Sequence, residues 1–186
     1  MIKKAKLDSY RMMNLWVDEV PDDCKGGKED IACIYKANKD ITWFSGILCL
    51  EIKLAPRDAS NYAMLNFKFT ENSSGNFKIL YKQSKEDNIV ISDIAAPGDI
   101  VRNGIVKNYY NALAQLFDEL SAQNIFPSGI LEILGGRHGL IGSSDFAVTT
   151  VAKILINLFE EGEKLEESDL ETIILEGCKR KIKVQH

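Results

Sequence analysis

The chain has 186 residues, of which 45% are hydrophobic and 27% are charged, and its formal net charge is −4. This length and composition are typical of one globular domain that buries a sizeable core. The acidic balance argues against a protein that coats nucleic acid by bulk electrostatics, although a local basic patch is compatible with it.

Targeting segments and disulfides are not expected from this sequence. The N-terminal segment lacks the apolar stretch and small-residue cleavage site of a signal peptide, and no apolar run is long enough to span a membrane. The cysteines are too few and too scattered for a disulfide scaffold. They are Cys24, Cys33, Cys49 and Cys178. We therefore expect a cytoplasmic protein with reduced thiols.

The first half of the chain is predicted to form strands. Segments in which apolar and polar residues alternate lie at 31–37, 47–55, 62–70 and 77–83, and a shorter candidate lies at 89–94. In the second segment, Leu50 and Ile52 face one way and Glu51 the other, a pattern typical of a half-buried strand. The third and fourth segments are separated by the polar loop 71–76, which predicts an antiparallel hairpin.

The second half is predicted to be mainly helical. Apolar residues at three-and-four spacing predict a helix over 105–124, and 146–162 has a similar stripe and a glycine stop at Gly162. Between them, 130–134 is a compact strand candidate. A capping box at Ser168 predicts a short helix closed by Gly177, followed by the basic tail 179–186. The order of elements predicts an α+β fold, a mixed or antiparallel sheet with two long helices on one face.

The most informative stretch is 134-LGGRHGLIGSSD-145, in which a glycine-rich loop is expected at 135–142. The glycines do not have the spacing of a P-loop or of a dinucleotide fingerprint. The following helix start offers free backbone N–H groups, but Asp145 in its first turn already satisfies that end. We therefore expect no nucleotide and no other cofactor.

The same stretch contains residue types that occur in catalytic and metal sites. His138, Ser143, Ser144 and Asp145 are residue types of a nucleophile–base–orienter triad, but they crowd into one loop and the G-x-S-x-G elbow is missing. One of the two serines is more simply the N-cap of the next helix. With two histidines and no C-x-x-C pair, the chain has no recognisable metal motif. No catalytic residue and no metal ligand are therefore assigned.

Contact with a partner is the remaining role for the loop. Gly136 and Gly139 flank Arg137 and His138, and the apolar Leu140 and Ile141 have no evident place in a helix or strand. A projecting loop with these side chains suits a partner surface or an RNA backbone. The alternative is a simple strand-to-helix connection in which the two apolar residues fold back into the core.

Residues 41–162 resemble domain IV of elongation factor G and of the tetracycline-resistance ribosomal protection proteins. The features that carry the resemblance are the strand 47–58 with its proline-bearing end, the helix 105–127, and the segment 130–155. The most specific match is Gly-x-x-His ending at His138, followed by Ser-Ser-Asp-Phe-Ala at 143–147.

The resemblance implies a left-handed βαβ arrangement, as in the second domain of ribosomal protein S5. It divides the chain into an N-terminal extension (1–40) that could supply an edge strand, a core (41–162), and a C-terminal helix with a basic tail (163–186). In the family, domain IV reaches the decoding region, where its tip loops meet tRNA and mRNA. By analogy, Arg137 and His138 would stand at the tip, and residues 143–145 would form the loop base and helix cap.

The chain also departs from the family. Its gap between His138 and Ser143 is one residue longer than in elongation factor G, and no GTP-binding motif is present. The resemblance is therefore to a stand-alone module without the GTPase domain, which binds no GTP and cannot act as a translocase.

These observations predict a non-enzymatic binding module that contacts RNA or a ribosome-associated partner through the 135–142 loop. One alternative is a protein-interaction or homodimeric module without nucleic acid, favoured by the negative charge and by Trp43 and Phe44, which we expect to be exposed. A further alternative is an enzyme that uses His138 as a general base.

Overall fold

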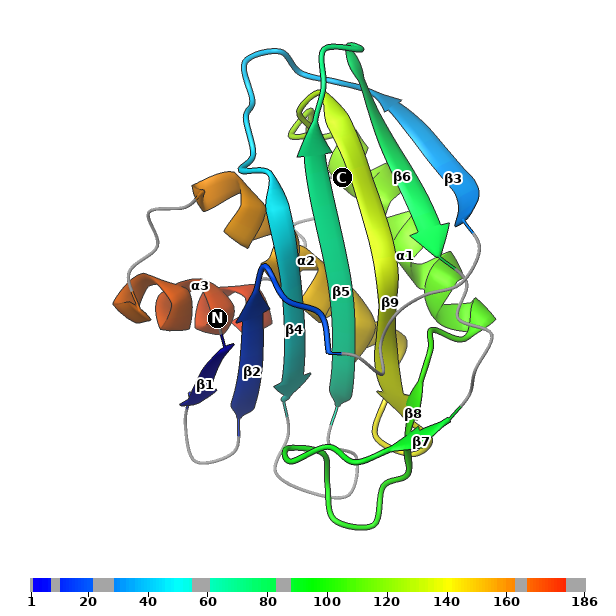
Figure 1. Ribbon diagram of the computed structural model, residues 1–186, viewed down its shortest axis with the longest axis vertical. Helices are drawn as coiled ribbons and strands as arrows, with labels where there is room; N and C mark the ends of the chain where they lie inside the picture. The colour runs from blue at the N-terminus through cyan, green and yellow to red at the C-terminus, as the bar shows by residue number, and fades with distance from the viewer. Residues whose placement is uncertain are drawn as a thin grey trace.

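The computed structural model describes residues 2–7, 11–21, 29–54, 61–82, 88–162 and 167–179. These residues form one mixed sheet of nine strands, with three helices behind it (Figure 1). The strands are β1 (Ile2–Lys6), β2 (Met12–Val17), β3 (Glu29–Lys36), β4 (Gly46–Lys53), β5 (Tyr62–Glu71), β6 (Asn76–Lys82), β7 (Ile89–Val90), β8 (Val101–Asn103) and β9 (Gly129–Gly139). The helices are α1 (Lys107–Ser121), α2 (Asp145–Glu161) and α3 (Glu167–Lys179). The predicted α+β class is confirmed.

The strand order across the sheet is β1-β2-β4-β5-β9-β6-β3, and the short pair β7 and β8 joins it beside β9. Neighbours are antiparallel except for β6 and β9, which are parallel and are connected through α1. A βαβ unit is therefore present, as parallel neighbours require. Its left-handedness and its likeness to the second domain of ribosomal protein S5 stay predictions.

The predicted hairpin of β5 and β6 is wrong, because β9 lies between the two strands. β5 pairs with β9 on one side, and β6 pairs with β9 on the other. Leu131 and Ile133 of β9 are completely buried, so this strand needs a neighbour on each side to satisfy its backbone groups. The alternation of apolar and polar residues therefore correctly indicated that β5 and β6 are strands. It did not indicate which strands they pair with.

The N-terminal residues belong to the same sheet as the rest of the chain. β2 pairs with β4 and carries β1 as one outer strand, while β3 pairs with β6 at the opposite edge. At the other terminus, α3 continues through Gly177, so the predicted stop there is wrong. A Cβ at Gly177 would lie 2.5 Å from Ile154 Cγ1, which shows that this glycine lets α3 approach α2 closely. Residues 180–186 of the basic tail lie outside the described residues.

The core lies between the sheet and the helices and is rich in aromatic rings. Trp43 is only 4% exposed, and its ring centroid lies 5.3–6.1 Å from those of four phenylalanines. Phe44 is half-buried and its ring centroid lies 5.1 Å from that of Phe159 in α2. The expectation that Trp43 and Phe44 are exposed is therefore wrong. The reason is that the backbone of Phe44 is hydrogen-bonded to Phe159, which draws this segment onto the helix layer.

The opposite face of the sheet is covered at its lower end by residues 88–103, which we call the strap (Figure 1, green). Ile94 and Val101 of the strap pack on Tyr62 of β5 in a small apolar cluster. Among the described residues, no helix has the length and apolarity needed to traverse a membrane. The strap matters because it contacts both the buried polar residues and the exposed turn that follows β9.

Candidate functional site

The predicted glycine-rich loop is largely strand. Gly136, Arg137, His138 and Gly139 belong to β9, and only 140–142 form a turn. Arg137 is 9% exposed and His138 6% exposed, so the expectation that they project into solvent is wrong. β5 pairs with one edge of this segment and β8 with the other, so the segment lies inside the sheet.

His138 lies on the helix side of the sheet. Its Nδ1 is 2.9 Å from the carbonyl oxygen of Gly104, and its ring centroid is 6.1 Å from that of Tyr109 in α1. Because a carbonyl only accepts, Nδ1 carries the hydrogen and donates it. Within the described ranges this is the one hydrogen bond of the His138 side chain, and no carboxylate contacts the ring to orient it. This arrangement offers no support for a general-base role.

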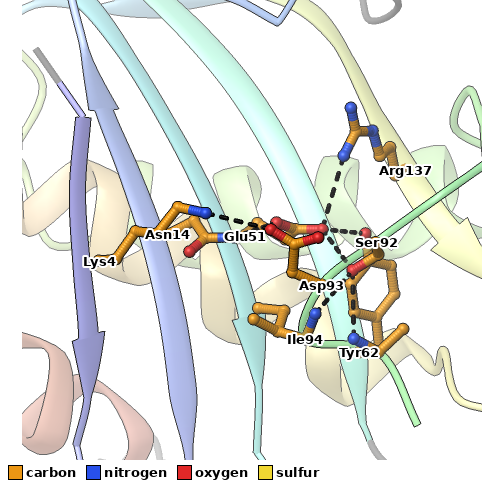
Figure 2. Close-up of polar contacts among 9 residues, drawn as sticks. Lys4, Asn14, Glu51, Tyr62, Ser92, Asp93, Ile94 and Arg137 are labelled. Carbon is orange, nitrogen blue, oxygen red and sulfur yellow. Dashed lines mark hydrogen bonds and ion pairs between the residues drawn. The ribbon is translucent and has the colours of Figure 1, made fainter. Parts of the chain in front are cut away.

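Arg137 lies on the opposite side and reaches a buried carboxylate, that of Glu51 (Figure 2). Its Nη1 is 3.6 Å from Glu51 Oε1. Asn14 Nδ2 donates to Oε2 at 2.7 Å, while Tyr62 OH and Ser92 Oγ donate to Oε1 at 2.6 and 2.8 Å. We call these five residues the Glu51 cluster. They come from β2, β4, β5, β9 and the strap, so the cluster joins four strands to the segment that covers them.

The Glu51 cluster surrounds the carboxylate with three hydrogen-bond donors and one guanidinium group. Glu51 is 1% exposed, and a buried acidic side chain is tolerated only when its oxygens have such partners. Burial, followed by the neighbouring charge of Glu51, raises the pKa of Tyr62 far above its ordinary value. Tyr62 therefore stays protonated and donates. The two cavities described below are lined by other residues, so we assign the cluster a structural role.

The alternation in β4 placed Glu51 correctly, on the face opposite Leu50 and Ile52. It did not reveal that this face is covered, because the covering strap lies about forty residues further along the chain. A single carboxylate within the otherwise apolar run 46–52 is the only sequence signal that could have suggested a buried partner.

The turn at 140–142 is held by the strap and by its own base. Asp99 accepts from the backbone N–H groups of Ile141 and Gly142, both at 3.0 Å, and Leu140 N donates to Ile100 O at 3.0 Å. A Cβ on Gly139 would fall 2.0 Å from Asp99 Oδ2, so glycine makes room for this carboxylate. The turn is therefore a braced structure.

The base of the turn leads directly into α2. Ser143 Oγ accepts from Gly139 N at 2.8 Å and donates to the carbonyl of Tyr62. Ser144 is the N-cap, and its Oγ accepts from Ala147 N at 3.2 Å. Asp145 lies in the first turn, where its charge favours the helix dipole. These three residues set the direction in which the chain leaves β9.

Ser144→Ala is expected to lower the free energy of unfolding by about 1 kcal/mol, because it removes an N-cap acceptor. The measurement is urea denaturation followed by circular dichroism. Ser121→Ala at the end of α1 is the control, since its hydroxyl bonds only a carbonyl three residues earlier, and a change within about 0.5 kcal/mol is expected there. Equal effects for the two variants would contradict the capping role.

Exposed large apolar side chains are concentrated at one end of the molecule. Five of them, 41–67% exposed, lie at the start of β8, just after the end of β9 and at the starts of the first two helices. We call them the end patch: Ile100, Val106, Leu140, Ile141 and Phe146. Phe146 begins the segment 146–162, whose apolar stripe was predicted to be buried, but it is the second residue of α2 and is exposed.

A groove of about 770 Å³ lies between α1 and α2, and Val106 and Phe146 of the end patch are among the residues that line it. Further along it lie the carboxamides of Asn108 and Asn111 and the half-buried Lys153. Burial lowers the pKa of Lys153, and the nearby Glu119 opposes that shift. A second cavity, of about 190 Å³, lies at the β2 and β4 side of the core.

No protein-family model matches this chain. Neither does any curated protein or any solved structure. The resemblance to domain IV therefore rests on the quoted residues, and its implied tip position, His138, is buried. Within the described ranges, no three histidine, cysteine, aspartate or glutamate side chains gather as metal ligands would.

Proposed function

We propose that the chain is a binding module that docks a partner protein through the end patch and the adjoining groove. The observation that carries this proposal is the gathering of five exposed large apolar side chains at one end. Large exposed apolar patches mark interaction sites in soluble proteins. Burying one such side chain stabilises a complex by about 1.5–3 kcal/mol, so covering the patch with a partner is energetically favourable.

The rigidity of the turn supports the same proposal. Leu140 and Ile141 stand on a backbone held by Asp99 and Ser143, so little conformational entropy remains to be lost on binding. The idea that these two side chains fold back into the core is wrong, since they are 53% and 67% exposed. A preformed apolar projection next to a groove suits insertion into a partner.

The chemistry of this end favours a protein over RNA. Arg137 and His138, which we expected to contact RNA, are buried beside the turn. The residues 140–142 carry no cation, and the carboxylates of Asp99 and Asp145 flank them. Negative charge at the contact would repel phosphates.

The double variant Leu140→Ser, Ile141→Ser should weaken partner binding at least about 100-fold, because two apolar side chains no longer leave water on binding. The immobilised protein is used to capture partners from cell extract, and the captured proteins are then titrated by calorimetry. Ile34→Ser is the matched control, since Ile34 is 56% exposed but lies on β3, away from the end patch.

In the same experiment, light scattering measures the oligomeric state of the purified protein. A concentration-dependent dimer that the double variant abolishes would identify the partner as a second copy of the chain. Capture of the same proteins, at the same affinity, by the wild type, the double variant and the control would contradict the proposal.

A further inference from the structure

The sheet ends in two edge strands, β1 on one side and β3 on the other. Figure 1 shows β3 as the outermost strand on its side of the sheet. It pairs with β6 along one edge, and no strand that the structure describes pairs with its other edge. Along this outer edge, β3 therefore offers a row of backbone N–H and C=O groups to which a further strand can add.

Contacts with the helix layer hold β3 in place. Tyr35 OH donates to Asp118 Oδ1 of α1 at 2.8 Å, and the Tyr35 ring centroid lies 5.5 Å from that of Phe126. Because the strand is already fixed, little conformational entropy is lost when another strand pairs with it. On the face away from the helices, Ile34 is 56% exposed. An apolar side chain on such an edge favours coverage by a partner.

A β-bulge interrupts the pairing of β3 with β6. Ile31 pairs with Leu80 and Cys33 with Ile79, so Ala32 is an extra residue between them. In a regular strand, residues an odd number of positions apart lie on opposite faces. The extra residue reverses this rule for residues on either side of the bulge. The face that points away from the helices is therefore shared by residues 29, 31, 34 and 36.

The bulge makes β3 able to pair with the same strand of a second copy along its whole length. A dimer of this kind has a twofold axis normal to the sheet, and residues opposite one another must then share a face. When all eight residues overlap in antiparallel order, position 29 lies opposite 36, and 31 lies opposite 34. Both pairs share a face because of the bulge, whereas in a regular strand of eight residues they would not.

The residues that face each other in this register are complementary. Glu29 lies opposite Lys36 of the second copy and Ile31 opposite Ile34, and the symmetry repeats each pair. Opposite charges and apolar pairs directly across two strands stabilise a sheet. The other edge differs, because the full antiparallel overlap of β1 would set Lys4 against Lys4 of a second copy. Lysines thus protect the β1 edge from self-pairing, and the charges of β3 do not.

We propose that two copies of the chain form a dimer by antiparallel pairing of their β3 strands, which joins the two sheets into one continuous sheet. The twofold symmetry closes the assembly at two copies, since each β3 edge is then occupied. The end patch and β3 share no residue, so this dimer is independent of the proposed partner contact.

Reversing the charge at either end of β3 tests the pairing. Lys36→Glu and Glu29→Lys each set like charges opposite one another at two places in the dimer, so each should raise its dissociation constant roughly tenfold. An equimolar mixture of the two variants restores both opposite-charge pairs and should form heterodimers as tightly as the wild type forms homodimers. The measurement is sedimentation equilibrium of the full chain, with one variant carrying a fluorophore in the mixture.

Two further variants are the controls. Lys107→Glu makes the same change of charge at the start of α1, away from β3, and should keep the dissociation constant within about twofold of the wild-type value. The double variant Leu140→Ser, Ile141→Ser should also keep it, which separates this dimer from self-association through the end patch. Circular dichroism confirms that the variants are folded.

Hydrogen exchange of the wild-type protein locates the interface without any substitution. As the concentration is raised and dimer forms, backbone amides of β3 should exchange more slowly, because those on the outer edge become hydrogen-bonded. Amides of β1, at the opposite edge, should exchange at an unchanged rate.

The proposal is overturned if the protein stays monomeric at every accessible concentration, or if it dimerises without slower exchange in β3. It is also overturned if the mixture of Lys36→Glu and Glu29→Lys associates no more tightly than either variant alone, or if Lys107→Glu weakens the dimer as much as they do. A dimer that the double variant Leu140→Ser, Ile141→Ser abolishes would place the self-contact on the end patch instead.

Discussion

Glu51→Ala is expected to lower the free energy of unfolding by about 3–5 kcal/mol, the cost of removing one partner from a buried ion pair. The substitution takes away the carboxylate that faces Arg137 and accepts from Asn14, Tyr62 and Ser92. All four donors then lose a partner where little water can replace it. Few single substitutions outside the aromatic core should cost more.

Urea denaturation measures this effect, and two further variants separate its causes. Glu51→Gln keeps an acceptor oxygen and loses the charge, so an intermediate loss is expected. Glu132→Ala removes a partly exposed carboxylate with two lysine partners and should cost about 1 kcal/mol or less. A loss below about 1 kcal/mol for Glu51→Ala would contradict the assigned role of the cluster.

The same substitution should also loosen the strap. Ser92 Oγ donates to Glu51 and accepts from the backbone N–H groups of Ile94 and Ala95, so it anchors the strap locally. An ion pair between Lys4 and Asp93 lies at the rim, but both side chains are exposed and contribute little (Figure 2). Faster hydrogen exchange at Ile94 and Ala95 in Glu51→Ala, with unchanged exchange in α2, is the expected pattern.

Gly136→Ala is expected to cost about 3 kcal/mol, the upper end of the range for overpacked sites. A Cβ at this position would lie 2.2 Å from the backbone oxygen of Met64 in β5. Backbone cannot rotate aside as a side chain can, so the two paired strands would have to separate. The effect is read as a shift of the urea midpoint at constant slope.

Gly75→Asn is the control for Gly136→Ala. Gly75 has φ +72°, and a Cβ there meets nothing within 4 Å, so asparagine should be accepted at a cost below about 1 kcal/mol. If Gly136→Ala were tolerated as well as this control, the segment 135–139 would behave as the open loop that its composition suggests. A large difference between them supports its place inside the sheet.

The strap connects the Glu51 cluster to the end patch. One end is anchored on Glu51 through Ser92, and Asp99 near its other end braces the turn that presents Leu140 and Ile141. The Glu51 cluster therefore helps to hold the strap that supports the end patch, although none of its residues belongs to the patch. This arrangement explains why a sealed polar network and an exposed apolar surface occur on one short segment.

Local signals in the sequence were sufficient for the helices and for the strands from β3 to β6, but not for β1, β2, β8 and the second half of β9. The three-and-four spacing over 105–124 corresponds to α1, and the glycine at 162, with φ +83°, ends α2. Period-two alternation located β3, β4, β5 and β6 within two residues. These features depend on neighbours within a few residues along the chain, which is why periodicity and capping reveal them.

Long-range contacts decided the rest. The insertion of β9 between β5 and β6, and the strap over Glu51, join residues separated by forty or more positions. A run such as 135-GGRHG-139 is compatible with a flexible loop and with a strand pressed against its neighbour, because glycine serves both. Only the tertiary structure shows Met64 closing on Gly136, with Arg137 and His138 enclosed on opposite faces. The sequence by itself determined the helices and the strands from β3 to β6; that 135–139 is strand, and which surfaces remain open to a partner, was decided by how the segments pack.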